Sequence, residues 1–423
     1  MTNITTLKIY NKMYKEISRC RVCKSSNLEN VLSLGQQYLT GVFPASKDTA
    51  VSYGPVDLVW CNTCMLVQLM QSYSLDEMYG DNYGYNSSLN QSMVNHLQSK
   101  VVNLLKKVNL LPNDIILDIG SNDATSLKCY PSSLRRIGID PTGNKFRKYY
   151  PADISLVPDF FSADNFRKIF PVEKAKIVTS IAMFYDLEDP LQFTADIEEV
   201  LADDGIWHFE QSYLPAMLRS NSYDTICQEH IEYYSLITVK NLLDRNNLQI
   251  IDVEMNDING GSFAITAVKK NSTFKPNVGV INWMLEEEER MGLHTIKPYL
   301  QFSDRMQEHR KSLISLLDKL KKEGKEIIGY GASTKGNVLL QYCNIGTQYL
   351  TSIAEVNELK FGSYTPGTLI PIIPEEEAMK MQPDYFLVLP WHFRNNILNS
   401  KNAKEFRAAG GKFIFPFPYI EIV

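Results

Sequence analysis

The sequence predicts an α/β protein built from a small metal-binding domain, a central Rossmann-like domain and a second Rossmann-like domain at the C-terminal end. Three observations support this prediction. Two C-x-x-C pairs lie near the start, apolar strand candidates alternate with helical patterns from about residue 114 to 270, and a second strand, glycine turn and helix start follow residue 326. We expect the domains to span 1–75, 76–275 and 276–423.

The overall composition excludes two classes of partner. The 423 residues carry a formal net charge of −5, and the pI of about 5.8 gives no electrostatic case for binding nucleic acid. No apolar run reaches the roughly 18 residues needed to span a bilayer, and the N-terminal stretch lacks a signal-peptide core. We therefore expect a cytoplasmic monomer with neither a membrane nor a nucleic-acid partner.

Four of the seven cysteines form the two C-x-x-C pairs, Cys20 with Cys23 and Cys61 with Cys64. In a reducing compartment this double spacing favours a metal site over disulfides. Four thiolates complete a tetrahedral zinc shell and leave no coordination position for water, which indicates a structural ion. A redox dithiol is the alternative that the spacing leaves open.

A tyrosine-rich stretch and a helix come next. Tyr79, Tyr83 and Tyr85 are interspersed with glycines and asparagines, so they favour a loop that offers rings and hydroxyls to a ligand, or one that packs on a neighbouring domain. The apolar spacing over Leu89–Val108 predicts a helix before the central sheet.

The segment from Ile115 to Ala124 predicts a buried strand, a small-residue turn and a helix start, which is the ligand-binding corner of a doubly wound sheet. The turn Gly120-Ser121-Asn122 lacks the further glycines of a dinucleotide fingerprint, and Asp118 before it would repel a phosphate. Asp140 ends the next strand and suits a ribose diol. A ligand with a ribose, a positive charge and no phosphate is S-adenosylmethionine. Alternatively, the two acids only cap strand ends.

Further strands and one short motif extend this sheet. Alternation with helical patterns predicts a parallel sheet of about seven strands. Asp159, Phe160 and Phe161 follow the third strand, where an acid and two rings could frame an adenine or could belong to the core. The predicted strands are Ile115–Ile119, Arg136–Asp140, Ile154–Val157, Ile177–Ile181, Gly205–Phe209, Leu248–Val253 and Phe263–Val268.

The stretch from Ser222 to Tyr234 concentrates titratable groups and has little apolar periodicity. It contains His230, a side chain suited to moving a proton near neutral pH, with Glu229 beside it. A lone histidine is more often structural, but the density of acids and tyrosines around this one favours function. The turn Asn259–Ser262 then predicts a β-hairpin or a backbone contact to substrate.

The C-terminal part begins with a charged helical pattern from 281 to 322 that Pro298 interrupts, and continues as a second α/β unit. Its segment Glu326–Gly336 again reads as strand, glycine turn and helix start, with Lys335 placed for an anion. Together with His392 and Arg394 after a later strand, Lys335 would suit a diphosphate. Surface charges at loop ends are the alternative. The further predicted strands are Ser352–Val356, Tyr385–Leu389 and Lys412–Phe415.

Nearly the whole chain carries motifs of one family, in the same order. They are the paired cysteines, Tyr83-Gly-Tyr85, Leu117-Asp-Ile-Gly-Ser-Asn-Asp123, Tyr223-Asp-Thr-Ile-Cys-Gln-Glu-His230, Asn259-Gly-Gly-Ser262, Gly329-Tyr-Gly-Ala-Ser-Thr-Lys-Gly336, Tyr364-Thr-Pro-Gly367 and Leu389-Pro-Trp-His-Phe393. Through them the chain resembles the zinc-containing, S-adenosylmethionine-dependent C-methyltransferases that act on nucleotide-linked deoxysugars.

The resemblance implies a class I methyltransferase fold for the central domain and a C-terminal domain that helps to hold a dTDP- or GDP-linked 4-keto-6-deoxyhexose, most often methylated at C3. It implies that His230 is the general base, with Glu229 beside it. Asn259 or a tyrosine hydroxyl would stabilise the enolate. The other residues that it implies are Tyr83, Tyr85 and Tyr185 for catalysis, and Tyr223, Ser333 and Tyr364 for substrate binding.

The sequence departs from the family in three places. Ala124 replaces a usual glycine, Cys227-Gln228 replaces a frequent Tyr-His pair, and Tyr185 stands where some members have a histidine. Two other classes stay open. One is a methyltransferase for RNA or protein, although the acidic chain lacks a basic stripe. The other is a non-methylating, dehydrogenase-like protein that binds nucleotide sugars through the turn at 329–336 and needs no S-adenosylmethionine.

Overall fold

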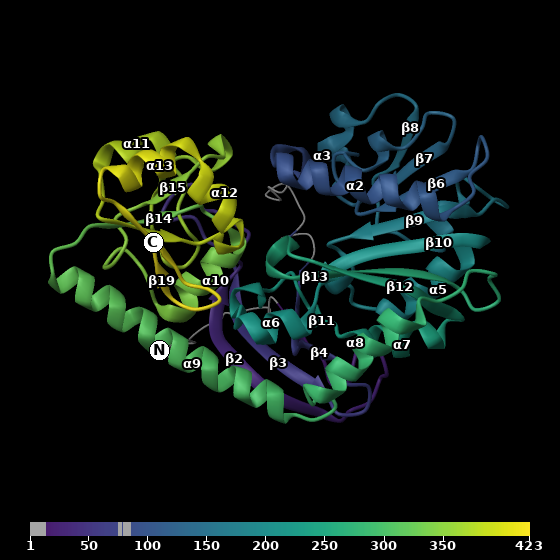
Figure 1. Cartoon of the computed structure of the whole chain (residues 1–423), viewed down its shortest axis with the longest axis horizontal. Helices are drawn as coiled ribbons and strands as arrows, with labels where there is room; N and C mark the ends of the chain where they lie inside the picture. The colour runs from purple at the N-terminus through teal and green to yellow at the C-terminus, as the bar shows by residue number, and fades with distance from the viewer. Residues whose placement is uncertain (1–13, 75–77, 79–85) are drawn as a thin grey trace, which may run out of the picture.

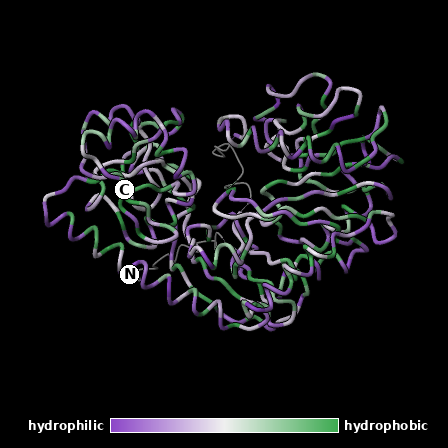
Figure 2. The backbone as a smooth tube through the Cα atoms, in the orientation of Figure 1, coloured by the Kyte–Doolittle hydropathy of each residue, from purple (hydrophilic) through white to green (hydrophobic). Residues whose placement is uncertain are grey.

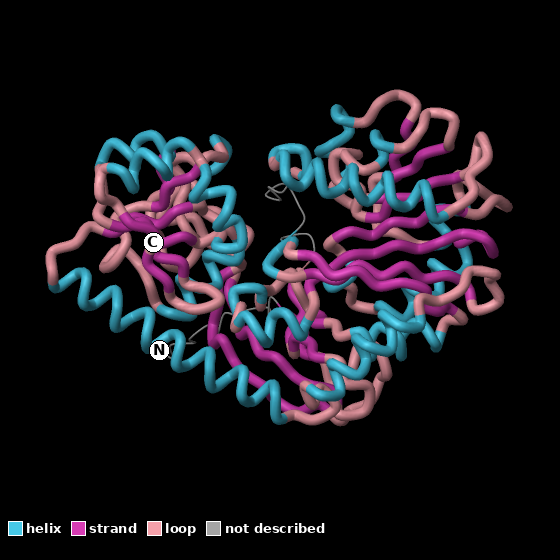
Figure 3. The backbone as a smooth tube through the Cα atoms, viewed as in Figure 1, coloured by secondary structure: helices cyan, strands magenta, loops and turns pink. Residues whose placement is uncertain are grey.

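The computed structural model describes residues 14–74, 78 and 86–423. Two α/β lobes lie side by side, and a small sheet together with a long helix runs beneath both of them (Figures 1 and 3). The sheets are apolar along their strands and the outer helices carry the polar residues (Figure 2). Within the described part of the chain, no helix is both long enough and apolar enough to cross a membrane.

The N-terminal unit is a sheet that borrows a strand from the central lobe. Its own strands pair in the order β4, β3, β2, and β11 (Glu232–Tyr233) adds to the free edge of β4. A separate two-stranded ribbon joins β1 to β5. The strand bounds are β1 (Tyr14–Glu16), β2 (Leu28–Tyr38), β3 (Tyr53–Cys61), β4 (Val67–Leu69) and β5 (Gln71–Tyr73).

The central lobe has the expected seven-stranded sheet, in the order β12-β13-β10-β9-β6-β7-β8. It is not wholly parallel, because β13 runs antiparallel to both of its neighbours. Only a short loop joins β12 to β13, and so short a connection can link only antiparallel strands. The bounds are β6 (Ile115–Ile119), β7 (Arg135–Ile139), β8 (Ile154–Val157), β9 (Ala175–Ile181), β10 (Leu201–Ser212), β12 (Leu248–Asn256) and β13 (Ser262–Lys269).

Helices cover both faces of this sheet, as a doubly wound fold requires. Ile116 and Ile177 pack with Val101 and Leu104 of α2 on one face, while other strand residues pack with α5, α7 and α8 on the opposite face. The helix expected over 89–108 is α2. The bounds are α2 (Gln91–Lys107), α3 (Gly143–Phe146), α4 (Ala163–Arg167), α5 (Pro190–Val200), α6 (Leu214–Ser220), α7 (Leu236–Arg245) and α8 (Val278–Arg290).

The packing of α8 bears on the expected boundary at 275/276. Glu288 of α8 accepts hydrogen bonds from Tyr213 Oη at 2.8 Å and from the backbone nitrogen of Leu236 at 2.5 Å. Ile281 and Met284 bury themselves in the core of the central sheet. Helix α8 therefore packs as part of the central lobe, and the 26-residue α9 (Lys297–Lys322) is the first element of the next one.

The C-terminal lobe is a second Rossmann-like unit, with a sheet in the order β16-β15-β14-β17-β18-β19. Only β19 is antiparallel. Pro298, expected to break a helix, lies instead in the first turn of α9, where its missing N–H leaves no hydrogen bond unmade. The bounds are β14 (Ile327–Tyr330), α10 (Thr334–Cys343), β15 (Ile353–Glu355), β16 (Ile372–Pro374), α11 (Glu375–Met381), β17 (Tyr385–Val388), α12 (Arg394–Asn399), α13 (Lys401–Ala408), β18 (Lys412–Phe415) and β19 (Glu421–Ile422).

Candidate active site and metal centre

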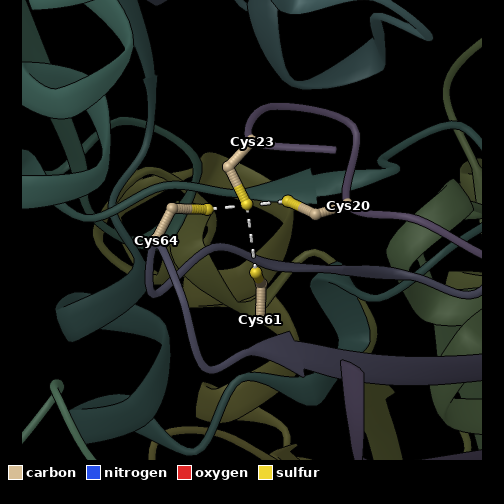
Figure 4. Close-up of side chains that lie close together, drawn as sticks. All are labelled: Cys20, Cys23, Cys61 and Cys64. Atoms are coloured by element: carbon tan, nitrogen blue, oxygen red, sulfur yellow. Dashed lines mark hydrogen bonds between the residues drawn. The ribbon is translucent and has the colours of Figure 1, made fainter. Parts of the chain in front are cut away.

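The four paired cysteines converge on one point from two knuckles (Figure 4). Cys20 Sγ lies 3.5 Å from Cys64 Sγ, Cys23 Sγ lies 3.4 Å from Cys61 Sγ, and all four sulfurs fall within 4.8 Å of one another. A tetrahedral ion with Zn–S bonds of about 2.3 Å needs sulfurs about 3.8 Å apart, so the cluster fits zinc. Protein ligands alone fill the shell, as in a structural site.

The two knuckles have the same backbone form. Each C-x-x-C is followed by a residue in the left-handed region, Lys24 at φ 60° and Met65 at φ 67°. In each knuckle the amide of that residue donates back to the first cysteine carbonyl, at 3.0 Å for Lys24 and 2.8 Å for Met65. This turn directs both thiols of a pair toward the same side.

The turn after β6 is tied to the end of β7. The Asn122 amide donates to Asp140 Oδ2 at 2.7 Å, and Thr142 donates to Oδ1 through its backbone amide at 2.7 Å. Thr142 Oγ1 also donates to Oδ1 at 2.5 Å, so three of the roughly four acceptor positions of this carboxylate are taken and one remains for a ribose hydroxyl. Gly120 lies in the left-handed region at φ 69°, and a Cβ there would meet the Met183 side chain at 3.1 Å. This corner brings the predicted cofactor residues together at the carboxyl ends of β6 and β7.

Asp118 has a hydrogen-bond partner that the sequence did not reveal. It is buried in β6 and accepts from Thr179 Oγ1 on β9 at 2.5 Å, and burial raises its pKa to about 7. Ser121 Oγ lies 2.7 Å from Tyr150 Oη. Ala124 has φ 63°, which explains why a glycine is usual at this position and why alanine is strained there.

The three residues expected around an adenine separate into two groups. Asp159 and Phe160 are exposed beyond the end of β8, with the Phe160 ring 49% accessible. Phe161 is half-buried, and its ring centroid lies 5.1 Å from that of Phe193 in the core. Asp159 and Phe160 are therefore open to a ligand, whereas Phe161 packs as a core residue.

His230 lies two residues before β11, the strand that the central lobe contributes to the N-terminal sheet. Its Nδ1 is 2.9 Å from the Thr225 carbonyl oxygen. Because a carbonyl can only accept, Nδ1 carries the proton and Nε2 keeps its lone pair. Burial lowers the pKa of His230 to about 4, so the ring is neutral near pH 7. The Tyr185 ring meets it edge-on, with centroids 4.4 Å apart. The geometry makes His230 Nε2 an available base.

Glu229 faces the N-terminal unit. Its Oε2 lies 3.4 Å from Thr40 Oγ1, and a Cβ built on Gly41 would come within 2.7 Å of Oε1, so only glycine allows this approach. Burial raises the pKa of Glu229. The Thr40 carbonyl in turn accepts from Asn337 Nδ2 of α10 at 2.7 Å. One loop of the N-terminal unit thus contacts both lobes beside His230.

The turn between β12 and β13 is held by two side chains of the C-terminal lobe. Lys335 Nζ donates to the Asn259 carbonyl at 2.6 Å, and a Cβ on Gly260 would meet the Trp391 ring at 3.0 Å. Asn259 itself has φ 56°. Trp391 Nε1 also donates to Asp224 Oδ2 at 2.7 Å. The turn is a hairpin loop, as one of the two sequence interpretations predicted, and its backbone faces the second lobe; a backbone contact to substrate stays a prediction.

Several polar atoms at this junction have no partner among the described residues. They include Asp224 Oδ1 and His392 Nδ1, both buried. Burial raises the pKa of Asp224 to about 6 and lowers that of His392 to about 3, and it also lowers the pKa of Lys335. Ser333 caps α10 by accepting from the Gly336 amide at 3.0 Å. The charge of Lys335 contributes to the lowered pKa of His392, so the two groups lie near each other, and His392 Nδ1 keeps hydrogen-bonding capacity for a ligand.

One expected substrate contact is corrected by its surroundings, and another stays a prediction. Tyr223 is fully buried, and its hydroxyl lies 2.9 Å from His309 Nδ1, so it packs against α9 and not against a ligand. Arg394 Nη2 donates to both carboxylate oxygens of Glu421 at 3.0 Å, while its Nε has no partner among the described residues, so its contact with a substrate stays a prediction.

The remaining expected contact and two tyrosines complete the comparison with the sequence. Tyr364 is half-buried, and its amide donates to the Pro44 carbonyl at 2.9 Å, beside the N-terminal unit. Tyr83 and Tyr85 lie outside the described residues. The sequence analysis missed Asp224 and Trp391, although both stand inside motifs that it quoted for other residues.

Comparisons with known proteins agree with this architecture. A family model described as "C-methyltransferase C-terminal domain" matches residues 257–418, and one described as "Putative zinc binding domain" matches 20–79. The C-methyltransferase NovU of Streptomyces niveus is 30% identical over 413 residues, 97% of each chain.

The comparison with solved structures gives matches of low similarity. An S-adenosylmethionine-dependent methyltransferase from Clostridium acetobutylicum is 14% identical, with a TM-score of 0.31, over 41% of this chain and 91% of its own. The mitomycin 7-O-methyltransferase MmcR is 12% identical, with a TM-score of 0.33, over 43% of this chain and 55% of its own.

Proposed function

Since the chain belongs to the C-methyltransferase family and is an S-adenosylmethionine-dependent enzyme with a structural zinc site, we propose that its acceptor is a dTDP- or GDP-linked 4-keto-6-deoxyhexose, methylated at C3. The proposal connects the base at His230 with the polar junction between the lobes. It places the enzyme in the biosynthesis of branched-chain deoxysugars.

The observation that carries the proposal is the fixed tautomer of His230. With Nδ1–H held by the Thr225 carbonyl, Nε2 is free to take a proton from carbon. A ketone at C4 acidifies the neighbouring C3 proton, so its removal gives an enolate. Bound S-adenosylmethionine supplies an electrophilic methyl group, which the enolate carbon receives in line. The residues then mainly hold the two reactants in position.

The enolate oxygen needs a hydrogen-bond donor. The Asn259 amide and the Tyr185 hydroxyl are the candidates in the described part of the chain, and Tyr83 and Tyr85 are candidates from the sequence. Lys335 fixes the Asn259 carbonyl, which would orient the side chain of the same residue. Glu229, hydrogen-bonded to Thr40, would hold the peptide that carries the base.

The cofactor would lie at the carboxyl ends of β6, β7 and β8. Asp140 would accept from one ribose hydroxyl through its remaining acceptor position, and the turn at Gly120, which lies close to Met183, would line the same corner. Asp159 and Phe160, both exposed, would meet the adenine. Asp118, Ser121 and Asn122 support this corner through their own hydrogen bonds.

The nucleotide sugar would enter between the lobes. Lys335 and His392 have donor capacity for a diphosphate, and Ser333 caps the N-terminus of α10, the helix that carries Lys335. Tyr364 lies beside the loop at 40–47 and would contact the same ligand from the C-terminal lobe. This arrangement uses all three units to enclose one substrate.

The test is mass spectrometry of dTDP- and GDP-4-keto-6-deoxyhexoses incubated with the enzyme and S-adenosylmethionine. We expect one of them to gain a single methyl group. With the cofactor withheld, solvent deuterium should enter at C3, because proton removal precedes transfer. If neither nucleotide gains a methyl group while S-adenosylmethionine still binds, the acceptor assignment is wrong.

A further inference from the structure

Arg21 is a buried cation inside the first cysteine knuckle. It stands between Cys20 and Cys23, and only 3% of its surface is accessible. Its guanidinium reaches past the knuckle: Nη1 donates to the Leu69 carbonyl at 2.6 Å, and Nη2 donates to Ser72 Oγ at 2.8 Å. Burying a charge is costly unless it is paired and hydrogen-bonded, so these contacts are what allow the guanidinium to lie inside the protein.

Arg21 donates to a residue of β4, and β4 also holds the polypeptide next to His230. Leu69 ends β4, and its amide donates to the Ile231 carbonyl at 2.8 Å. Glu232 of β11 pairs with Gln68 of β4, whose side chain accepts from the Arg21 amide at 3.1 Å. Ile231, the residue directly after His230, is thus held by β4, and Arg21 of the knuckle holds β4 in turn.

Arg21 also lies near a second element that contacts His230, the loop after β9. Its Nε lies 3.6 Å from Glu188 Oε2, in the loop after β9. The same loop carries Tyr185, whose ring meets His230 and whose carbonyl accepts from the Ile231 amide at 3.0 Å. The knuckle therefore touches both structures that flank the imidazole.

Glu232 places a buried carboxyl group on the borrowed strand near Arg21. It is 1% accessible, and its Oε2 accepts from Tyr234 Oη at 2.9 Å. Burial raises the pKa of Glu232, and the nearby charge of Arg21 opposes that increase. The contacts of Arg21 and Glu232 join the N-terminal sheet to the strand after the base.

We propose that Arg21 is a positioning residue, which transmits the rigidity of the zinc knuckle to β11 and the Tyr185 loop and so fixes the imidazole of His230. The catalytic meaning of this placement rests on the proposed function of His230 as base. The physical link itself, from the knuckle to the borrowed strand, does not depend on the acceptor.

The experiment compares the full-length Arg21→Lys variant with the wild type by hydrogen–deuterium exchange, without any acceptor. Lysine keeps the charge but cannot reproduce the fork to Leu69 and Ser72. We expect exchange in the segment 226–236 to rise at least tenfold, while zinc content and S-adenosylmethionine affinity stay within twofold. Arg19→Lys is the matched control, because Arg19 precedes the same knuckle, is exposed and donates only to the Lys24 carbonyl among the described residues.

Ser72→Ala is the second variant, and it controls for a folding defect that Arg21→Lys would cause in the knuckle. It removes one acceptor of the guanidinium without changing any residue between the cysteines, and we expect a smaller rise confined to 226–236. Unchanged exchange in that segment in both variants overturns the proposal. So does a uniform rise across the whole N-terminal unit, because it would show general loosening.

The kinetic constants kcat and KM can be measured only with an acceptor that the enzyme methylates. With the dTDP- or GDP-linked substrate that is methylated, Arg21→Lys should lower kcat about tenfold and leave KM unchanged. A change in KM alone would contradict a positioning role. If no acceptor is methylated, the exchange result still decides the structural link.

Discussion

Replacing His230 by asparagine separates catalysis from stability. The asparagine Nδ2 can donate to the Thr225 carbonyl, as His230 Nδ1 does at 2.9 Å, so the variant keeps this hydrogen bond and loses only the basic nitrogen. General base catalysis contributes about 10²–10⁴ in rate, or roughly 3–5 kcal/mol in the transition-state barrier. One altered hydrogen bond changes unfolding free energy by about 1 kcal/mol, or about 2–4 °C in Tm for a unit of this size.

The pH profile tests the same residue without a mutation. A base works in its neutral form, so kcat/KM should rise as pH rises through the pKa of His230 and level off above it. With that pKa lowered by burial to about 4, the rate should already be level by about pH 6. An ordinary histidine, with a pKa of about 6.5, would still be mostly protonated at pH 6.

The assay is methyl transfer followed by mass spectrometry from pH 4.5 to 8, with calorimetry of each protein. His294→Asn is the matched control, because His294 is exposed in the link between α8 and α9. His230→Asn should bind S-adenosylmethionine like the wild type and lose turnover. Turnover within tenfold of the wild type, or an acid limb centred near pH 6.5, would refute the reasoning.

Three further changes address the metal, the cofactor and the hairpin. Cys61→Ser should abolish stoichiometric zinc and lower the unfolding free energy by several kcal/mol, checked by metal analysis and calorimetry; retained zinc would contradict the site. Asp140→Ala should weaken S-adenosylmethionine binding about 10- to 100-fold by titration calorimetry, and an unchanged Kd would exclude the ribose contact. Gly261→Ala should cost about 2–4 kcal/mol, because φ is +124° and its Cβ would lie 2.6 Å from Ala216 Cβ. Gly279→Ala is the control: this glycine is exposed in α8 with open space around it, so the change should leave stability unaltered or raise it by up to about 1 kcal/mol.

The sequence predicted what local patterns encode. Continuous apolar runs such as Ile115–Ile119 mark buried strands without reference to the rest of the chain, and the double C-x-x-C spacing alone predicts a closed metal shell. The acid at the end of β7 was predicted because a doubly wound sheet repeats the same geometry at each strand end. Asp140 bonds to the turn after β6, and its contact with a ribose stays a prediction.

The sequence carried no local pattern that predicts packing between segments far apart in the chain. Nothing local to Glu232–Tyr233 reveals that this two-residue strand completes a sheet begun at Leu28, because its partner lies far away in the chain. Tyr223 was expected at the substrate, since a tyrosine in a reactive-looking motif has the same letters whether its hydroxyl meets a ligand or His309. The sequence pattern also groups α8 with the following helix α9, although the hydrogen bond of Glu288 attaches α8 to the central lobe.

The strand borrowed by the N-terminal sheet has a consequence for how the chain folds. During synthesis, β4 leaves the ribosome long before Glu232 does, so its hydrogen-bonding edge stays open while more than a hundred residues are added. An open edge with Val67 and Leu69 on it can pair with another chain. We therefore expect a fragment ending at residue 75 to aggregate even when zinc is present, and the same fragment to stay dispersed when a peptide spanning 228–236 is added.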